Sequence, residues 1–311
     1  MSLKEKLFDP RRQVLLYGTT PPRAGTPESR VHAAAEKLAA RVAPLPLDGL
    51  VVYDIQDESG RAQNPRPFPF TGTIDPRAYA TLLEARTRHP AITYKALGGL
   101  TEPEWRVWLA ESRTAFKIEF LSVVGRPTSG IRHSLPLARA IRIAAEPATG
   151  LTVGGVAITE RHTAQRSESA RLLAKGIEGC GYFISQTVYH PEPTEQLLRD
   201  YLRDCRGAGV EPRRIVLTFS PVGREKTMAF LRWLGVNVPP ETANAILSAP
   251  NPLAESIEIC RANLRQILAH DYVREIPLGI NVDSVSINRD EIDSSVDLFH
   301  ALTEVLRGRR G

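Results

Sequence analysis

Several features of membrane, secreted and metal-binding proteins are missing from this 311-residue sequence. No apolar run approaches the roughly 20 residues that a bilayer-crossing helix requires, and the first residues include no apolar segment followed by a small-residue cleavage site. The three cysteines, Cys180, Cys205 and Cys260, lie far apart without CxxC or His-rich spacing, which argues against a zinc site or a disulfide framework. We therefore expect a cytoplasmic chain with no membrane partner, no bound metal, and cysteines that act as small buried hydrophobes.

Charge of one sign is also scarce. Lys and Arg number 40 against 35 Asp and Glu, which gives a net charge of +5, and no run of five like charges occurs. This pattern provides no basic arm or patch for nucleic acid, so we expect no nucleic-acid partner. A mild positive field is compatible with an anionic small ligand or with simple solubility. The sequence does not fix the oligomeric state and leaves a homo-oligomer open.

Three sequence motifs that define large enzyme classes are missing as well. No Gly-x-Gly-x-x-Gly follows the first strand-like run, which removes the main signal for a dinucleotide-binding open sheet. No Walker A motif is present, which argues against a nucleoside triphosphatase. No Gly-x-Ser-x-Gly elbow is present either, so acyl transfer by a serine nucleophile has no support.

What the sequence does contain is a repeated alternation of short β-branched runs with longer amphipathic runs. The eight strand-like runs are 14–17, 50–55, 92–97, 116–124, 152–158, 182–189, 214–220 and 276–282. Eight strand–helix pairs in a chain of this length predict an α/β fold, the (β/α)8 TIM barrel, as a single domain over residues 1–311. The proline-rich segment 64–70 is expected to be either a surface loop or a lid over the site.

In such a barrel the active site lies at the C-terminal ends of the strands. Here these ends are expected at 18–23, 53–58, 94–99, 119–126, 157–162, 185–189, 218–224 and 281–284. Asp54, Glu119 and Gln186 each interrupt an otherwise apolar run, as inward-pointing site residues do. The same pattern is also typical of a structural hydrogen-bonded network inside the barrel.

Two further segments carry candidate chemistry. Glu160 and His162 follow the fifth strand, where they are suited to act as acid and base. They are equally suited to a surface salt-bridge cluster with Arg161 or Arg166. The segment 125–130 offers a cation, hydroxyls and backbone amides beside a helix start, which is typical of a phosphate site and also of an ordinary turn.

The order and spacing of several strand-end segments resemble those of the methylenetetrahydrofolate reductase family over most of the chain. The matching segments are Pro21-Pro22-Arg23, the stretch 175–186 (KGIEGCGYFISQ), and Ser220-Pro221-Val222 followed by Phe230 and Val238-Pro239. Members of this family are (β/α)8 barrels that reduce 5,10-methylenetetrahydrofolate to 5-methyltetrahydrofolate with NAD(P)H, usually through FAD. The resemblance therefore implies an oxidoreductase of one-carbon metabolism with a folate substrate.

The resemblance also implies roles for individual residues. Gln186 matches a folate-contacting glutamine, and Phe230 lies near the position where the aromatic ring of the substrate stacks. Lys175 matches a lysine that binds a cofactor phosphate, although a solvated helix face explains it equally well. Four further residues fall at family positions in the cofactor and catalytic regions: Tyr94 (in place of a histidine), Arg126 (in place of an aspartate), and Glu160 with His162 (a similar Glu-x-His).

One departure affects the mechanism directly. The essential acid of the family lies three residues before the double proline, and this sequence has Gly18 there. The reaction requires protonation of N10, so that the ring opens to an iminium ion that accepts hydride. We expect the proton donor to come from a neighbouring strand, with Asp54, Glu58, Glu119 and Glu160 as candidates.

These observations favour a methylenetetrahydrofolate reductase-like enzyme that uses NAD(P)H and has altered or lost its use of FAD. Two alternatives stay open. One is a folate-dependent methyl transfer or demethylation enzyme, which needs no hydride and tolerates the loss of the acid. The other is a noncatalytic folate-binding relative.

Overall fold

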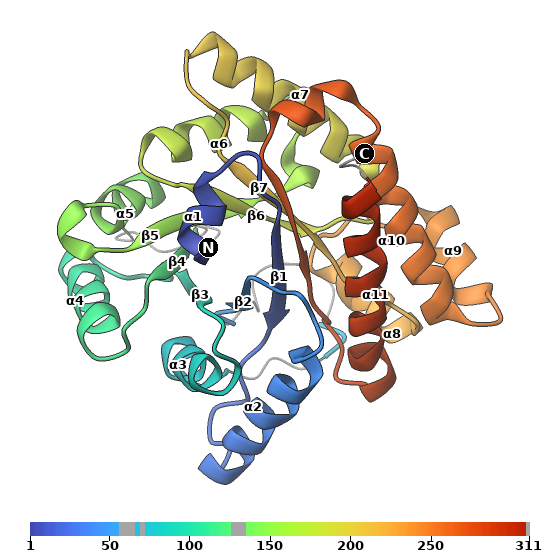
Figure 1. Ribbon diagram of the computed structural model, residues 1–311, viewed down its shortest axis with the longest axis horizontal. Helices are drawn as coiled ribbons and strands as arrows, with labels where there is room; N and C mark the ends of the chain where they lie inside the picture. Colours follow the sequence, from blue (N-terminus) through green and yellow to red (C-terminus); the bar gives the residue numbers. More distant parts are fainter. Residues whose placement is uncertain (56–65, 69–71, 126–134, 309–311) are drawn as a thin grey trace.

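A computed structural model describes residues 1–55, 66–68, 72–125 and 135–308. Eight parallel strands form a closed barrel in the order β1-β2-β3-β4-β5-β6-β7-β8, so each strand pairs with its sequence neighbours and β1 pairs with β8. Figure 1 shows the helices arranged around these strands. The prediction of a (β/α)8 barrel is confirmed.

The elements follow the predicted alternation. The strands are β1 (Val14–Thr19), β2 (Gly49–Val52), β3 (Ala91–Ala96), β4 (Phe120–Val124), β5 (Thr152–Ala157), β6 (Tyr182–Thr187), β7 (Arg214–Phe219) and β8 (Leu278–Val282). The α-helices are α1 (Leu3–Phe8), α2 (Glu28–Val42), α3 (Pro76–Thr87), α4 (Glu102–Thr114), α5 (Leu137–Ala144), α6 (Glu168–Ile177), α7 (Pro191–Gly207), α8 (Glu225–Trp233), α9 (Pro240–Ser248), α10 (Pro252–Leu268) and α11 (Arg289–Gly308). Short 3-10 turns are η1 (Pro147–Thr149), η2 (Thr159–Arg161) and η3 (Asp271–Glu275).

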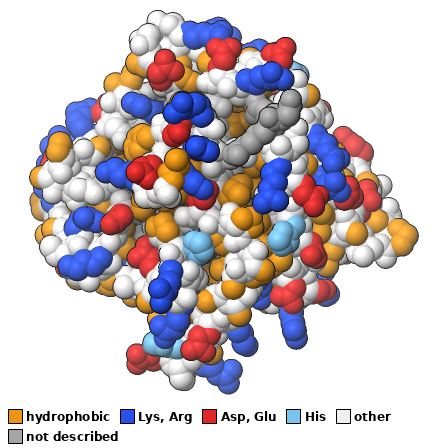
Figure 2. Space-filling view, viewed as in Figure 1, with side chains coloured by type: hydrophobic (Ala, Val, Ile, Leu, Met, Phe, Trp, Pro, Cys, Tyr) orange, Lys and Arg blue, Asp and Glu red, His pale blue; other side chains and the backbone are white. Residues whose placement is uncertain are grey.

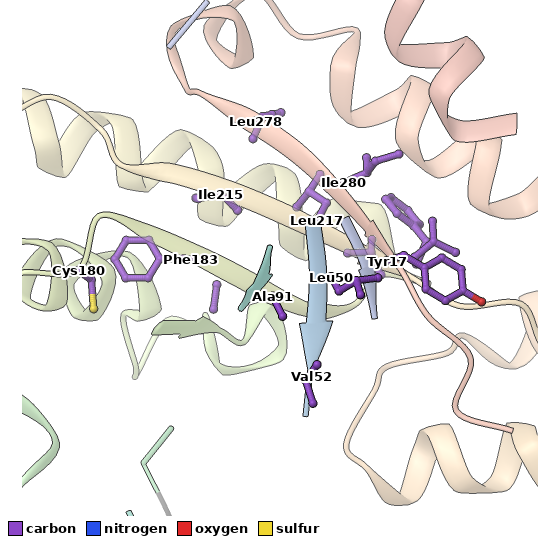
Figure 3. Close-up of a cluster of buried hydrophobic side chains, with 14 of the residues drawn as sticks. Tyr17, Leu50, Val52, Ala91, Cys180, Phe183, Ile215, Leu217, Leu278 and Ile280 are labelled. Carbon is purple, nitrogen blue, oxygen red and sulfur yellow. The ribbon is translucent and has the colours of Figure 1, made fainter. Parts of the chain in front are cut away.

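The strands place alternate side chains on the two faces of the sheet, as the period of an extended chain requires. The outer face packs against the helices; Figure 3 shows part of this layer, including Leu50, Phe183, Leu217 and Ile280. The prediction that the cysteines are buried hydrophobes is confirmed, because all three are buried and unpaired. Cys180 belongs to the same outer layer.

The inner face forms a second, smaller core that fills the barrel. Its members are Leu3, Leu7, Val14, Leu16, Val51, Ile92, Tyr94, Phe120, Tyr182, Ile184 and Val216. The ring of Tyr182 crosses Gly154 so closely that a Cβ at that glycine would lie 2.2 Å from the ring. Its hydroxyl donates to the carbonyl of Leu121 at 3.1 Å, so this large interior side chain has its polar group satisfied.

Helix α1 closes the N-terminal end of the barrel. Ser2 and Glu5 form a capping box at its start, and Leu3 and Leu7 insert into the inner core. Arg214, at the start of β7, is buried and donates to the carbonyls of Lys6, Leu7, Asp9 and Leu278. A cation at the C-terminal end of a helix interacts favourably with the helix dipole, so Arg214 holds α1 in place.

On the face shown in Figure 2, Lys and Arg side chains are interspersed with Asp and Glu side chains. Among the residues that the structure describes, no helix is both long and apolar enough to cross a membrane.

Candidate functional site

Polar side chains gather inside the barrel where β7, β8 and β2 reach their C-terminal ends. Tyr53, one residue past β2, donates from its hydroxyl to Asp283 Oδ2 at 2.7 Å. The Asn281 amide donates to the Tyr53 hydroxyl at 2.9 Å and lies 3.3 Å from Thr218 Oγ1. These side chains point inward because Leu278, Ile280 and Val282, the alternate residues of β8, belong to the outer core.

The Asp283 carboxyl is the unusual group of this network. Burial raises its pKa to about 6, while the hydroxyls of Tyr53 and Ser220 lower it by a smaller amount. Within the described residues, Asp283 Oδ1, Asn281 Oδ1 and Ser220 Oγ make no hydrogen bond of good geometry although they are buried. Buried polar atoms without partners are uncommon and mark a place where a ligand or water completes the bonding.

Gly18 lies directly against this carboxyl. A Cβ built on Gly18 would lie 2.9 Å from Asp283 Cβ and 2.8 Å from the Tyr53 hydroxyl. The space that a side chain at position 18 would occupy is therefore filled from β8 and β2. The sequence predicts Asp283 only as part of the strand-end range 281–284, where the motif Asn281-Val282-Asp283 ends an apolar strand.

Tyr94 extends the same inner layer to β3. Its ring makes an edge contact with the ring of Tyr53, with centroids 5.0 Å apart. Burial raises the pKa of Tyr94, and the Ser122 hydroxyl opposes that rise. Tyr94 is thus an interior neighbour of the Asp283 network.

Gln186 and Glu160 both hold the segment that follows α8. The Gln186 amide on β6 donates to the carbonyl of Leu234 at 2.8 Å. Glu160, in η2 after β5, accepts from the backbone amide of Asn237 at 3.3 Å. Burial raises the pKa of Glu160, although several hydrogen bonds oppose this rise. The structure therefore brings these two predicted site residues together at one side of the barrel end.

Phe230 on α8 belongs to an aromatic cluster. Its ring makes an edge contact with Phe68 at 5.3 Å and lies parallel to the Trp233 ring at 6.0 Å. The Arg66 guanidinium lies 4.7 Å from the Phe230 ring centre, and the Lys226 ammonium lies 4.9 Å from that of Phe68. The described part of the proline-rich segment, residues 66–68, therefore covers α8.

Two of the carboxylates predicted to lie at the site are elsewhere. Asp54 follows Tyr53 and so lies on the outer face, where it accepts from the Ala96 amide at 2.9 Å and lies 3.7 Å from the Lys95 ammonium. Glu119 is exposed and lies one residue before β4, at the opposite end of the barrel from the strand ends. The expectation that Glu119 lies at the C-terminal end of its strand is wrong because the strand begins only at Phe120.

His162 and Lys175 are engaged with other protein groups. His162 Nε2 lies 2.9 Å from Asp200 Oδ2, and its Nδ1 accepts from the Glu168 amide at 3.3 Å. Lys175 on α6 donates to the Val156 carbonyl at 2.7 Å and lies 3.6 Å from Glu168 Oε1. Burial lowers the pKa of Lys175, and the charge of Glu168 opposes this.

Glu58, Arg126 and most of the 125–130 loop lie outside the described residues. Within the described ranges, no three His, Cys, Asp or Glu side chains gather to hold a metal ion. A cavity of about 360 Å³ lies beside the Arg224–Asp290 ion pair and the start of α10, away from Asp283.

No protein-family model matches the chain, and no curated protein matches it. A solved structure does match: an uncharacterized protein from Clostridium thermocellum that binds two copies of 5-methyl-5,6,7,8-tetrahydrofolic acid. The two chains are 29% identical with a TM-score of 0.81, and the match covers 98% of this chain and 99% of that one. The barrel described above is therefore similar over its whole length to a folate-binding barrel.

Proposed function

We propose that this chain binds a tetrahydrofolate carrying a one-carbon unit at the C-terminal end of its barrel. The proposed reaction is the reduction of 5,10-methylenetetrahydrofolate to 5-methyltetrahydrofolate with NAD(P)H, as in the methylenetetrahydrofolate reductases that the sequence resembles. The observation that carries this proposal is the near-complete match to a barrel that binds 5-methyltetrahydrofolate.

The strand-end residues support a folate as ligand. A reduced folate combines a hydrogen-bonding pterin, an aromatic ring and an anionic glutamate. Gln186 and the unpartnered oxygens of Asn281 and Asp283 are polar groups at the barrel end, and Phe230 belongs to the aromatic cluster in which the Lys226 ammonium lies over Phe68. A few convergent polar groups beside apolar side chains are typical of small-molecule sites.

The residues expected to hold FAD fit that role poorly. His162 and Lys175 are each bonded to protein groups, and Tyr94 is buried in the inner core. The proposed reaction therefore uses no flavin step, and NAD(P)H donates the hydride as a substrate. The same observation favours a second candidate function, methyl transfer to or from the folate, which needs no hydride.

Binding and turnover test the proposal separately. Calorimetric titration with 5-methyltetrahydrofolate is expected to give saturable binding and a stoichiometry of one or two per chain. Anaerobic incubation with NAD(P)H and 5,10-methylenetetrahydrofolate, with and without added FAD, is expected to oxidise the nicotinamide in step with 5-methyltetrahydrofolate formation. Binding without turnover in either mixture would favour methyl transfer or a noncatalytic role, and the absence of binding would refute the folate assignment.

Gln186→Ala tests the predicted folate contact. Removal of one amide that bonds the ligand is expected to weaken 5-methyltetrahydrofolate binding by about 5- to 30-fold, equivalent to about 1–2 kcal/mol. The matched control is Gln266→Ala, because Gln266 is exposed on α10 and bonds only Glu192 among the described residues. Equal affinity of both variants would remove Gln186 from the site.

A further inference from the structure

We infer that Asp283 is the general acid of the reaction and that it delivers, from β8, the proton for which Gly18 on β1 has no side chain. This inference rests on the proposed function and adds a residue and a role to it. Tyr53 is the positioning residue that orients the carboxyl. Of the four carboxylates expected from the sequence, Asp54, Glu119 and Glu160 lack this combination of placement and bonding, and Glu58 lies outside the described residues.

The Asp283 carboxyl lies beside the position that a side chain on Gly18 would take. Asp283 Cβ lies 2.9 Å from where a Cβ on Gly18 would be, so the two side chains would start in direct contact. The register brings β8 beside β1, pairing Leu16 with Asn281, two residues before each of these positions. Asp283 is therefore an acid on the adjacent strand whose side chain starts next to position 18. Active sites on this fold tolerate an acid on a neighbouring strand because several strand ends face one space.

The bonding pattern decides which oxygen can give a proton. Asp283 Oδ2 accepts from the Tyr53 hydroxyl at 2.7 Å, and Tyr53 in turn accepts from the Asn281 amide at 2.9 Å. The neutral carboxylic acid therefore carries its proton on Oδ1, which makes no hydrogen bond of good geometry within the described residues, although the Ser220 hydroxyl is near enough to lower the pKa of the carboxyl. Oδ1 is buried, so the bound folate must reach this oxygen to take the proton.

No described cation influences this carboxyl, so burial dominates its titration. The titratable groups that face it are Tyr53, one residue past β2, and Tyr94 from β3, whereas Tyr17 from β1 lies on the outer face and bonds Ser295. All three are neutral at physiological pH because burial raises their pKa further. The remaining polar neighbour is the Ser220 hydroxyl from the end of β7. A carboxyl in such surroundings stays partly protonated near neutral pH, as a general acid requires.

The proposed reaction uses one proton from Asp283 and one hydride from NAD(P)H. Asp283 transfers the Oδ1 proton to N10 of 5,10-methylenetetrahydrofolate, and the bond between N10 and the methylene carbon breaks. The electron pair of that bond stays on N10, and the methylene carbon becomes an iminium with N5. Hydride from NAD(P)H reduces this carbon to a methyl group, and the Asp283 carboxylate regains a proton from solvent.

The experiment compares Asp283→Asn, Asp283→Glu and the control Asp297→Asn in the full-length protein. Asp297 is exposed on α11, so its substitution leaves the barrel end unchanged. Asp283→Asn is expected to lower kcat by about 10²- to 10⁴-fold while 5-methyltetrahydrofolate binding changes by less than about fivefold. Asp283→Glu is expected to restore part of kcat, because it returns a proton donor.

The pH profile separates an acid from a merely structural residue. In the unmodified protein kcat is expected to fall as pH rises above the pKa of the acid, and in Asp283→Asn the residual rate is expected to be independent of pH. Tyr53→Phe removes a hydrogen bond that stabilises the carboxylate, so the fall in kcat is expected to move to higher pH.

Each failure has its own signature. If the unmodified protein turns over and Asp283→Asn keeps kcat within threefold, the acid is elsewhere, while the proposed function stands. If Asp283→Asn loses folate binding to the same extent as turnover, Asp283 recognises the ligand and the acid role is overturned. If the unmodified protein binds folate without any reduction, both the reductase and its acid are refuted.

Discussion

Arg214 and Asp283 are buried at opposite ends of the barrel interior, and the two side chains are bonded very differently. At the N-terminal end, Arg214 donates to four backbone carbonyls that come from α1, the residue after it and β8. At the C-terminal end, Asp283 accepts a single side-chain hydrogen bond of good geometry and leaves Oδ1 without a partner among the described residues. Arg214 fastens α1 at one end of the barrel, whereas Asp283 keeps one carboxyl oxygen without a hydrogen bond of good geometry among the described residues.

The difference in bonding accompanies a difference in the direction in which burial shifts the two pKa values. Burial lowers the pKa of Arg214 to about 10, opposed by the charges of Asp9 and Asp48, so the guanidinium remains charged at neutral pH. Burial raises the pKa of Asp283 to about 6, where protonation changes within the physiological range. Strongly perturbed groups without full bonding are characteristic of catalytic and binding sites.

Loss of Arg214 is expected to have the largest effect. Arg214→Met removes every donor to the four carbonyls and should reduce the free energy of unfolding by about 3–5 kcal/mol. Urea unfolding, followed by circular dichroism, measures this change. The neighbouring Arg213 is exposed, so Arg213→Met serves as the matched control and should change stability by less than about 0.5 kcal/mol. Similar losses in both variants would contradict the structural role given to Arg214.

At the other end, Gly18→Ala is expected to distort the Asp283 network. The added Cβ would lie within 3 Å of both Tyr53 and Asp283, and such overpacking typically costs about 1–3 kcal/mol. Turnover should fall with stability because the carboxyl is displaced. Gly207→Ala on α7, where a Cβ meets nothing within 4 Å, provides the comparison. For the same reason, Gly18→Glu would add a carboxyl but would also displace Tyr53 and Asp283.

The Asp283 carboxyl is expected to destabilise the fold when it is ionised. Its pKa lies about two units above the usual value of 3.8, equivalent to roughly 2–3 kcal/mol. This cost is fully present above pH 6 and disappears as pH falls through 6 towards 3.8. Asp283→Asn should therefore unfold at higher urea concentration than the unmodified protein at pH 8, and the gap should narrow near pH 4. A constant gap, or a less stable variant at pH 8, would contradict the assigned pKa.

The smallest effect is expected at Glu119. Because this exposed residue lies at the closed end of the barrel, Glu119→Gln should leave folate affinity and kcat unchanged within the error of calorimetry and rate assays. A tenfold loss of either would mean that the closed end also takes part in ligand binding, and the contrast between the two ends would fail.

The alternation of strands and helices could be predicted from sequence because hydrophobic periodicity and cap residues are local signals. Asp75 caps α3, and Thr101 with Glu104 forms a capping box on α4; residues of these types at such positions are recognisable in a sequence. Helix α1 was not predicted, because six residues give too few turns for a periodic signal. Its capping box at Ser2 and Glu5 was the only local indication.

The direction of each side chain at the site depends on where its strand begins and ends, and these boundaries have weaker sequence signals than the strands themselves. The run 116–124 looks like one long strand, yet Lys117 adopts a left-handed backbone with φ of 58° and the amide of Ile118 bonds back to Ser112. Glu119 therefore precedes the strand. On β2, a side chain's direction alternates with every residue, so Tyr53 faces inward and Asp54 outward. The partnership of Asp283 with Gly18 arises only when β8 closes on β1.

The bonds that fasten α1 have a consequence for how the chain assembles during synthesis. The Arg214 guanidinium bonds the Leu7 carbonyl across 207 positions of sequence. When α1 leaves the ribosome, neither β7 nor β8 has been translated, so Leu3 and Leu7 have no enclosed interior to enter. Such distant contacts form slowly and leave apolar surface exposed in the meantime. Docking of this short helix is therefore expected to be a late event, because its partners in β7 and β8 are among the last segments to be translated.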